Sequence, residues 1–372
     1  MKIGIDGRAS KWYRGTGIGT YTYELINYLL KTSNDFNYYV HLPQNITFPP
    51  NQNINYIYTK DNGKENFWEE ISIPNNIDNL NLDLYHLPQS GIGMPNNHNC
   101  PYVITLHDII PYKLPKTVSS KFLSIFNKYM PNIVENSKAI ITVSEFSKED
   151  IAKAFNYDKN KIFVTHLASE DIYKPINKNL SKQLIKENYH IEDNFILYIG
   201  GFSPRKNILG LIESFSLLKQ KYKKPLKLVI AGAKGISYEI YKNRVDALCL
   251  QNDVIFPGFI SMEHMPYLYN SCECFVYPSF YEGFGLPPIE AMSCGVPVIA
   301  SNVTSIPEVV KDSAILINPN DVYALTLAIY DLLSNKELQQ KLIKSGLKRS
   351  AELTWENTIN HTISAYKKIL QI

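Results

Sequence analysis

The chain has 372 residues, of which 45% are hydrophobic and 20% are charged, which is typical of a folded globular protein and excludes wholesale disorder. The formal net charge of +3 is too small to predict nucleic-acid binding, although it permits a weak encounter with an anionic membrane surface. The five cysteines are odd in number, and their spacing fits neither a disulfide framework nor a zinc site.

Short apolar runs alternate with longer amphipathic segments, and this alternation predicts parallel, doubly wound α/β sheets. The first half contains predicted strands at Ile3–Asp6, Tyr38–Leu42, Ile54–Tyr58, Leu84–Leu87, Tyr102–Leu106, Ala139–Val143 and Ile162–Thr165, with helices such as Thr20–Lys31 and Ser120–Asn136. The second half contains strands at Phe195–Gly200, Leu226–Ala231, Val254–Pro257, Cys274–Tyr277, Pro297–Ala300 and Ala314–Ile317, and ends in helices at Val322–Leu333, Lys336–Glu352 and Trp355–Leu370.

Two successive strand–helix sets predict two Rossmann-like domains, because 372 residues exceed the usual size of a single core. We expect the first domain over residues 1–170, a linker without a strong strand over 171–191, and the second domain over 192–354. Ligands of such sheets bind at the carboxyl ends of the strands, so we expect the active site in a cleft between the two domains.

The segment Glu282-Gly-Phe-Gly-Leu-Pro-Pro-Ile-Glu290 follows a predicted strand and opens a helix. A helix start presents backbone N–H groups and the positive end of the helix dipole, which together favour an anion. The two prolines have no N–H, so the donors narrow to Gly283–Leu286. Two flanking carboxylates would repel a bare phosphate, and the pattern therefore favours a nucleotide-sugar. A helix preference for acidic residues would explain Glu290, but it explains Glu282 and the glycines poorly.

Three further clusters follow predicted strands. Arg205-Lys206, after Gly200-Gly201, could neutralise a departing diphosphate, or could be a solvated basic loop. His107 could hydrogen-bond a sugar hydroxyl or steer a developing positive charge, whereas a lone histidine is usually structural. The loop Gly15–Gly19 lacks the dinucleotide spacing G-x-G-x-x-G, and could fold over a diphosphate or simply start a helix.

The sequence contains no ligand set typical of a metal enzyme. It has no D-x-D pair flanked by apolar strands, no Cys/His set with zinc spacing and no H-E-x-x-H. We therefore expect no metal and no other cofactor beyond the donor substrate.

Together these motifs resemble the retaining glycosyltransferases of family 4, which have the GT-B fold of two Rossmann-like domains facing across a cleft. The resemblance runs nearly the full length of the chain. Two of the motifs, His-Asp-x-x-Pro at residues 107–111 and Val-Ser-Glu-Phe-Ser at residues 143–147, look like those of the bacterial mannosyltransferase-like branch used in polysaccharide assembly. The resemblance rests on Gly15–Gly19, His107-Asp-Ile-Ile-Pro111, Thr142-Val-Ser-Glu-Phe-Ser147, Gly200-Gly201 with Arg205-Lys206-Asn207, Gly258-Phe-Ile260 and Glu282 to Glu290.

The resemblance implies a role for each matching residue. Arg205 and Lys206 would bind the donor diphosphate, Glu282 would touch sugar hydroxyls and Glu290 would hold the ribose. His107 would lie beside the sugar ring. The other implied contacts are Gly17 and Gly19 closing over the diphosphate, Gly283, Phe284, Gly285 and Leu286 supplying backbone N–H groups to it, and Gly232, Phe259 and Ile260 lying near the base. Asp108 has no secure family role, and the helix from about residue 355 to 372 would pack back onto the first domain.

The predicted function is transfer of a hexose, with mannose as the first choice, from a GDP- or UDP-linked donor to a glycan or lipid-linked acceptor. An epimerase on the same fold and a non-catalytic sugar-binding subunit are the alternatives. An NAD-dependent dehydrogenase is disfavoured because neither half has G-x-G-x-x-G after its first strand. We expect a cytoplasmic protein, with peripheral contact to the inner face of the membrane left open. The apolar positions of Ser120–Asn136 favour core packing over membrane contact.

Overall fold

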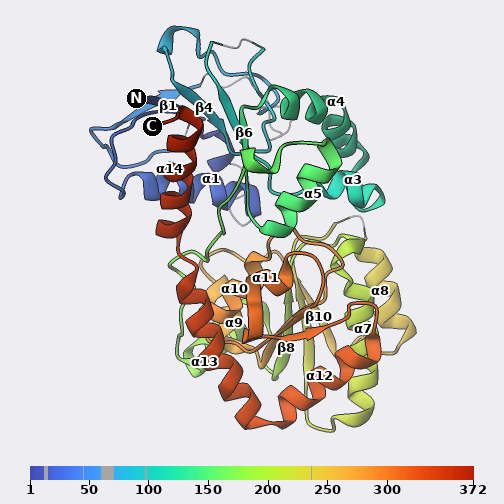
Figure 1. The fold of residues 1–372 in the computed structure, drawn as a ribbon. Coiled ribbons are helices and arrows are strands. Elements are labelled where there is room, and N and C mark those ends of the chain that lie inside the picture. The colour runs from blue at the N-terminus through green and yellow to red at the C-terminus, as the bar shows by residue number, and fades with distance from the viewer. Residues whose placement is uncertain (12–15, 45, 60–70, 97–98, 236) are drawn as a thin grey trace. The chain divides into compact units, whose positions relative to one another are not determined.

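Two parallel β-sheets, each flanked by helices, form the framework of the chain (Figure 1). The structure is a computed structural model that describes residues 1–372 except 12–15, 45, 60–70, 97–98 and 236. The chain divides into two compact units. Unit 1 comprises Met1–Pro115, Ser119–Leu167 and Thr354–Ile372, and unit 2 comprises Lys116–Val118 and Ala168–Leu353.

Unit 1 contains a seven-stranded parallel sheet in the order β3-β2-β1-β4-β5-β6-β7. Its strands are β1 Lys2–Asp6, β2 Asn37–Leu42, β3 Ile54–Tyr58, β4 Leu84–Leu87, β5 Tyr102–Thr105, β6 Ala139–Thr142 and β7 Ile162–Val164. Every residue of β4, β5 and β6 is buried, as expected for parallel strands covered on both faces. Continuous apolar runs therefore identified these strands better than an alternating pattern would have done.

The helices of unit 1 come from both ends of the chain. They are α1 Gly17–Leu29, α3 Ile110–Lys113, α4 Ser120–Asn136, α5 Glu145–Phe155 and α14 Trp355–Leu370. Figure 1 shows α14, the red helix at the carboxyl end of the chain, beside the blue helix α1. Thr354 caps α14 by accepting a hydrogen bond from the N–H of Asn357.

A buried polar network ties α14 to the sheet of unit 1. The Nδ1 atom of His86 lies 2.6 Å from the hydroxyl of Tyr366, and its Nε2 lies 2.7 Å from the hydroxyl of Thr105. The hydroxyl of Tyr21 on α1 lies 3.0 Å from the same Thr105 oxygen. Burial, and to a smaller extent the charge of His107, lowers the pKa of His86 to about 3. The ring is therefore neutral, with one nitrogen donating and the other accepting.

Unit 2 contains a six-stranded parallel sheet in the order β10-β9-β8-β11-β12-β13. Its strands are β8 Phe195–Ile199, β9 Lys227–Ala231, β10 Val254–Gly258, β11 Cys274–Tyr277, β12 Val298–Ser301 and β13 Ile315–Ile317. Its helices are α6 Lys178–Tyr189, α7 Ile208–Lys221, α8 Tyr238–Ala247, α9 Met265–Ser271, α10 Leu286–Ser293, α11 Ile306–Val310, α12 Val322–Ser334 and α13 Lys336–Glu352. The two sheets agree with the predicted α/β class.

Residues 171–191, which the sequence suggested as a linker, include helix α6 and group with unit 2 in this structure. Asn177 caps α6 by accepting hydrogen bonds from the N–H groups of Asn179 and Leu180. The helix buries Ser181 and Ile185 and packs against α9. Because the apolar face of α6 is narrow and its other positions are rich in Lys and Asn, the sequence of this helix resembled a linker.

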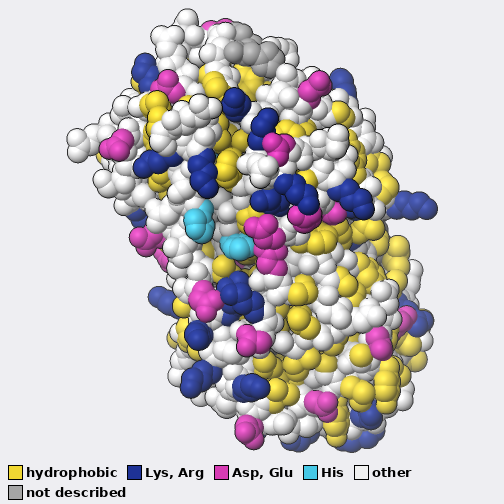
Figure 2. Space-filling model, viewed as in Figure 1, with side chains coloured by type: hydrophobic (Ala, Val, Ile, Leu, Met, Phe, Trp, Pro, Cys, Tyr) yellow, Lys and Arg dark blue, Asp and Glu magenta, His cyan; other side chains and the backbone are white. Residues whose placement is uncertain are grey.

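The surface mixes charges of both signs over the face drawn in Figure 2. On this face, Lys and Arg side chains gather where α3 and α5 of unit 1 lie, and hydrophobic side chains are more extensive over unit 2. Among the described helices, none is long and apolar enough to cross a membrane.

The His86 network generates a prediction about stability. Replacing Tyr366 by Phe leaves Nδ1 of the buried His86 without its partner, and should cost unit 1 about 1–3 kcal/mol in free energy of unfolding. Hydrogen exchange of the β4 and β5 amides measures the loss within unit 1. Tyr157→Phe is the control, because its hydroxyl donates to the carbonyl of Ser137 from a half-buried position. Equal losses in the two variants would contradict a special role for the network.

Candidate active site

The strand order of unit 2 indicates where a ligand binds. The order in which successive strands are added reverses between β8 and β11, because β8 to β10 extend the parallel sheet to one side and β11 to β13 extend it to the other. In doubly wound sheets, ligands bind at the carboxyl ends of the strands beside such a reversal. The segment with Arg205 and Lys206 follows β8, and the segment with Glu282 follows β11. Two groups separated by more than seventy residues in the sequence therefore meet at this point.

An ion cluster occupies this edge of the sheet. One oxygen of Glu282, Oε2, lies 2.9 Å from Nη1 of Arg205, and the other, Oε1, lies 2.6 Å from Nζ of Lys206. Nη1 of Arg205 also donates to the carbonyl of Tyr281 at 2.8 Å, and Nζ of Lys206 donates to the hydroxyl of Tyr277 at 2.6 Å. Each cation thus has its position set by two acceptors.

The charges in this cluster favour an anion. Burial alone would raise the pKa of Glu282, but the positive charges of Arg205 and Lys206 outweigh it and lower the pKa to about 2. The carboxylate is therefore ionised at neutral pH, and two cations around one carboxylate have a net charge of +1. Lys206 is only 8% exposed, so this charge acts where water screens it weakly. A diphosphate fits the sign and position of the charge.

The second carboxylate of the motif, Glu290, lies in a different environment. It is on α10, and its Oε2 accepts a hydrogen bond of 2.8 Å from the hydroxyl of Tyr269 on α9. Burial raises the pKa of Glu290 to about 7, with the Tyr269 hydrogen bond lowering it and the charge of Glu170 raising it. One sequence motif therefore contains two carboxylates that titrate several pH units apart.

The turn between these carboxylates is fixed by the next strand–helix connection. The hydroxyl of Ser305 donates to the carbonyls of Glu282 and Phe284, at 2.9 and 2.8 Å. Gly285 has a φ of 120°, and an added Cβ would lie 2.7 Å from the side chain of Ile306. Helix α10 begins at Leu286, with prolines in its first turn, as expected for a segment that opens a helix. Gly283, Phe284 and Gly285 thus end the connection between β11 and α10, which runs over residues 278–285, and Leu286 is the first residue of α10.

The predicted base-binding residues follow β9 and β10. The N–H of Gly232 donates to the carbonyl of Gly258 at 3.0 Å, and the N–H of Gly200 donates to the carbonyl of Ala231 at 3.1 Å. A Cβ at position 232 would collide with the carbonyl oxygen of Gly200, so a side chain cannot be accommodated there. Beyond Gly258, the side chain of Phe259 is 70% exposed whereas that of Ile260 is buried.

His107 lies in unit 1, directly after β5. Its Nε2 lies 3.1 Å from the carbonyl of Pro88, so Nε2 bears the proton and Nδ1 is an acceptor. The ring packs edge-to-face against Tyr21, with 4.9 Å between centroids. Burial lowers the pKa of His107 to about 4, which makes the ring neutral at physiological pH. The neighbouring Asp108 accepts a hydrogen bond from the N–H of Ile110 at 2.9 Å and so shapes the start of α3.

The predicted glycine loop differs from the structure in its extent. Helix α1 begins at Gly17 rather than Thr20, because the N–H of Thr20 already donates to the carbonyl of Thr16 at 3.0 Å. Gly17 and Gly19 are therefore in the first turn of the helix and not in a free loop, and Gly15 lies outside the described residues. The sequence had suggested a glycine loop over Gly15–Gly19 and a helix that begins at Thr20.

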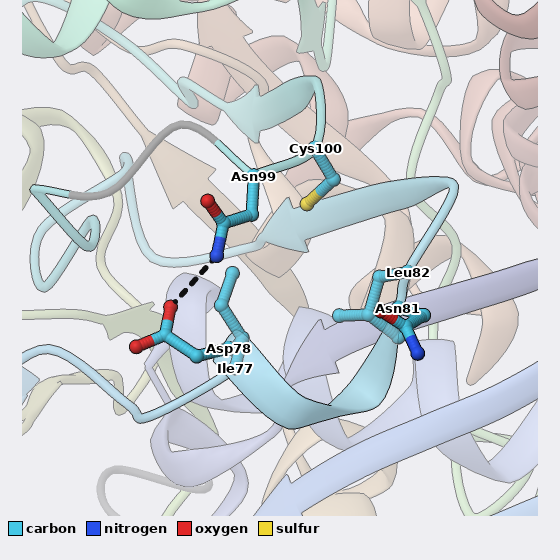
Figure 3. A pocket seen from close by; sticks show the side chains of 6 residues that line it. All are labelled: Ile77, Asp78, Asn81, Leu82, Asn99 and Cys100. Atoms are coloured by element: carbon cyan, nitrogen blue, oxygen red, sulfur yellow. Dashed lines mark hydrogen bonds between the residues drawn. The ribbon is translucent and has the colours of Figure 1, made fainter.

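A cavity of about 220 Å³ lies elsewhere in unit 1 and is lined by Ile77, Asp78, Asn81, Leu82, Asn99 and Cys100 (Figure 3). In Figure 3 the amide of Asn99 donates to the carboxylate of Asp78, at 3.0 Å. These residues precede β4 and β5, so the cavity is at the amino ends of the strands. Parallel sheets bind ligands at the opposite edge, and burial raises the pKa of Cys100 to about 11, which leaves its thiol protonated. The cavity is therefore not the candidate active site.

Two family models of glycosyltransferases match the chain. The family model described as Glycosyltransferase Family 4 matches residues 15–168, and that described as Glycosyl transferases group 1 matches residues 181–349. The chain belongs to the glycosyltransferase family that these two models describe. It is an enzyme of the glycosyltransferase class, so the prediction of a glycosyltransferase from the motifs is confirmed.

Two relatives from Escherichia coli show how far the sequence likeness extends. This glycosyltransferase is 36% identical over 265 residues to O-antigen chain mannosyltransferase B, covering 71% of this chain and 70% of that protein. It is 29% identical over 286 residues to the serotype-specific mannosyltransferase WbdA, covering 73% of this chain but 34% of that protein. The chain thus spans about a third of WbdA's length.

Solved structures confirm the GT-B fold. A sucrose-phosphate synthase from Thermosynechococcus elongatus superposes with a TM-score of 0.76 at 19% identity, covering 100% of this chain and 99% of that one. Anabaena HepE in complex with UDP and glucose superposes with a TM-score of 0.71 at 16% identity, covering 99% of each chain. At such low identity these matches establish the fold alone.

The structure groups some of the predicted site residues and separates others by unit. Arg205, Lys206 and Glu282 contact one another, whereas Glu290 pairs with Tyr269. His107, Gly17 and Gly19 belong to unit 1. The ligand contacts of all these residues stay predictions. Among the described residues, no three His, Cys, Asp or Glu side chains gather as a metal site.

Two tyrosines of the site were missed in the sequence. Tyr277 ends β11 and was assigned to an apolar strand, although its place at the carboxyl end of that strand was a usable signal. Tyr269 lies on a short helix, twenty-one residues before Glu290, and no spacing in the sequence connects it to that carboxylate.

Unit 1 also holds a buried ion pair between Asp6 and Arg8. The side-chain amide of Gln89 joins this pair by donating a hydrogen bond of 2.6 Å to the carboxylate of Asp6.

The ion cluster generates a prediction about stability and pH. Replacing Glu282 by Gln leaves two partly buried cations without their counter-charge and should lower the free energy of unfolding by about 3–5 kcal/mol. Because the pKa of Glu282 is lowered from 4.5 to about 2, its stabilisation is fully present above pH 4.5 and is lost as pH falls toward 2. Urea unfolding at several pH values should show the difference between the two proteins narrowing over that range.

The control is Glu192→Gln, which breaks an exposed ion pair with Lys186, 3.2 Å apart, in the same unit. Exposed pairs of this kind contribute at most about 1 kcal/mol. A loss from Glu282→Gln no larger than that from the control would show that the cluster does not stabilise unit 2.

Proposed function

We propose that this glycosyltransferase moves a hexose, with mannose as the first choice, from a nucleotide-sugar to a glycan or lipid-linked acceptor in bacterial surface polysaccharide synthesis. The observation that carries the proposal is the Arg205–Lys206 pair held by Glu282 beside the strand-order reversal of unit 2. The choice of mannose is supported by relatives named as mannosyltransferases, at 36% and 29% identity. GDP-mannose is accordingly the first donor to test, with UDP-sugars as the alternative.

The donor is held in unit 2 in this proposal. Arg205 and Lys206 bind the diphosphate, aided by backbone N–H groups of residues Gly283 to Leu286. Glu282 orients the two cations and meets hydroxyls of the donor sugar, and Glu290 accepts hydrogen bonds from the ribose. The base lies near Gly232 and the backbone of Phe259 and Ile260, at the carboxyl ends of β9 and β10.

The chemistry proposed is substitution with retention by a front-side route. The bond from the sugar C1 to the leaving phosphate oxygen breaks while the acceptor oxygen bonds to C1 on the same face, and the acceptor's proton passes to that phosphate oxygen. Arg205 and Lys206 stabilise the negative charge that develops on the diphosphate. In other enzymes a metal ion stabilises this charge. We propose that this enzyme catalyses the transfer without a metal. Neutral His107 offers Nδ1 as an acceptor for a sugar hydroxyl.

A panel of nucleotide-sugars tests the donor proposal directly. Thermal unfolding with GDP-mannose, UDP-glucose, dTDP-glucose and ADP-glucose should show a raised melting temperature with one donor class, because ligand bound only to the folded state stabilises it. The same assay with EDTA present tests metal independence. No shift with any donor would contradict the assignment of the site.

Replacing Lys206 by Ala tests the role of the basic pair. Loss of one preorganised positive donor should lower kcat by about a hundredfold to a thousandfold, as for removal of other groups that stabilise developing charge. Initial rates of sugar transfer to the acceptor give the measurement. The matched control is Lys186→Ala, which removes an exposed lysine of unit 2. Turnover of Lys206→Ala near that of the control would refute the role.

The finer part of the proposal is peripheral membrane contact through α4. Its buried side, with Phe126, Met130, Ile133 and Val134, packs into unit 1, whereas Lys121, Lys128 and Tyr129 are exposed. Nζ of Lys128 lies 4.8 Å from the centre of the Tyr129 ring. Exposed lysines beside an aromatic ring suit an anionic lipid surface.

Co-sedimentation with phosphatidylglycerol vesicles tests this contact. Lys121→Glu with Lys128→Glu should lower membrane partitioning by roughly tenfold or more, because each lysine near an anionic surface contributes about 1 kcal/mol. Added salt should weaken the wild-type binding. The double change Lys186→Glu and Lys341→Glu, exposed positions of unit 2, is the charge-matched control. Equal binding by both double variants would contradict contact through α4.

A further inference from the structure

The contact between Tyr269 and Glu290 is held more firmly than a surface hydrogen bond. The Tyr269 side chain is fully buried, and its hydroxyl lies 2.8 Å from Oε2 of Glu290. Its ring packs edge-to-face against Phe275 and Tyr173, with centroids 5.4 and 5.7 Å apart. Three aromatic rings thus fix the hydroxyl, and the hydroxyl fixes one oxygen of the carboxylate.

Among the described residues, the groups that act on the charge of Glu290 are few, and none of them is positively charged. From α9 comes the Tyr269 hydroxyl, and from the segment after β7 comes the buried carboxylate of Glu170. On α10 itself, the charge of Glu290 acts on the thiol of Cys294. In the described part of the chain, the other elements packed against α10, which are β11, β12, α11 and α13, bring no charge that acts on Glu290. Glu290 is therefore a carboxylate that depends on one neutral donor for its ionised form.

We propose that Tyr269 is a positioning residue for donor binding: its hydroxyl holds Glu290 in the ionised form and rotamer that accept the donor's ribose hydroxyls, so that donor binding is coupled to loss of a proton from Glu290. This inference rests on the proposed function, because it assumes that Glu290 meets the ribose. It adds to the proposed function a positioning residue, Tyr269, that lies outside the segment from Glu282 to Glu290, and a pH dependence of donor binding.

The physical reason is the number of acceptor positions on a carboxyl group. An ionised carboxylate has about four lone-pair positions, so Oε2 can accept from Tyr269 and still accept from a ribose hydroxyl. A protonated carboxyl group donates through one oxygen and loses part of this capacity. Burial and the Glu170 charge raise the pKa of Glu290 to about 7, and the Tyr269 hydrogen bond opposes them. The ionised form is therefore partly populated at neutral pH and is favoured by Tyr269.

The direction of the pH effect follows from these terms. Below the pKa of Glu290 the site binds donor better after losing a proton, so affinity should fall with falling pH, by at most about tenfold for each pH unit. Burial raises the pKa of Tyr269 itself well above its ordinary value, so its hydroxyl stays a donor throughout. A nucleotide-sugar is a diphosphate diester, so its phosphates have no proton that titrates between pH 5 and 9. The titration seen in binding then belongs to the protein.

The experiment measures the dissociation constant of GDP-mannose, or of the UDP-sugar that the thermal panel selects, by calorimetry from pH 5.5 to 9. The proteins compared are the wild type, Tyr269→Phe, Tyr173→Phe and Glu290→Gln. Tyr269→Phe keeps the ring and removes only the hydroxyl. Tyr173→Phe is the matched control, since it removes a hydroxyl from the ring packed against Tyr269.

The expected result is a change in the pH profile and not a uniform loss. In Tyr269→Phe the break in affinity should move to higher pH, with binding about tenfold weaker than wild type at pH 7 and within about threefold of it at pH 9. Tyr173→Phe should keep the wild-type profile. Glu290→Gln should bind more weakly at pH 9 and lose the break. A donor that lacks the 2′-hydroxyl should show a shallower pH dependence with the wild type.

Two results would overturn the inference, and they are distinguishable from failure of the proposed function. An unchanged break in Tyr269→Phe, or an equal shift in Tyr173→Phe, would show that Tyr269 has a structural role only. Binding by Glu290→Gln with the wild-type affinity and profile would show that Glu290 does not meet the ribose. Absence of nucleotide-sugar binding at every pH would refute the proposed function itself and this inference with it.

Discussion

The carboxylate of Glu282 is the group on which the rest of the site depends. Each of its oxygens pairs with a different cation. Both cations follow β8, whereas Glu282 follows β11, the neighbouring strand of the same sheet. Without this carboxylate, Arg205 and Lys206 would repel one another at the edge of β8 and would take up separate positions. With it, the connection after β8 and the connection after β11 become one charged surface of fixed geometry and positive sign.

The environment of each carboxylate, and not its residue type, decides its chemistry. Glu282 is buried beside two cations, which lower its pKa to about 2, whereas Glu290 is half-buried beside a tyrosine and another carboxylate, and its pKa is raised to about 7. The first is a permanent charge that orients its neighbours. The second is close to its titration point, so it can respond to ligand and pH.

Much of the fold followed from the sequence because buried parallel strands are continuous apolar runs. Strands such as Leu84–Leu87 and Cys274–Tyr277, and the helix Ser120–Asn136, have the predicted bounds. The start of α1 at Gly17 and the helix within 171–191 did not follow, because each depends on hydrogen bonds and packing that override local propensity. The roles of Arg205, Lys206 and Glu282 were suggested by motif, but their mutual contacts were not.

The sequence by itself determined the class of the protein, because its signals are local: two α/β sets, two glutamates eight positions apart at 282 and 290, and a basic pair after a strand can each be recognised from neighbouring residues. Tertiary structure alone decided which groups touch. The strand order β10-β9-β8-β11-β12-β13 brings residues 205, 206 and 282 to one edge, and packing of α9 on β11 brings Tyr269 to Glu290. Burial and distance set the pKa of a carboxyl group, and neither quantity exists until the chain has folded.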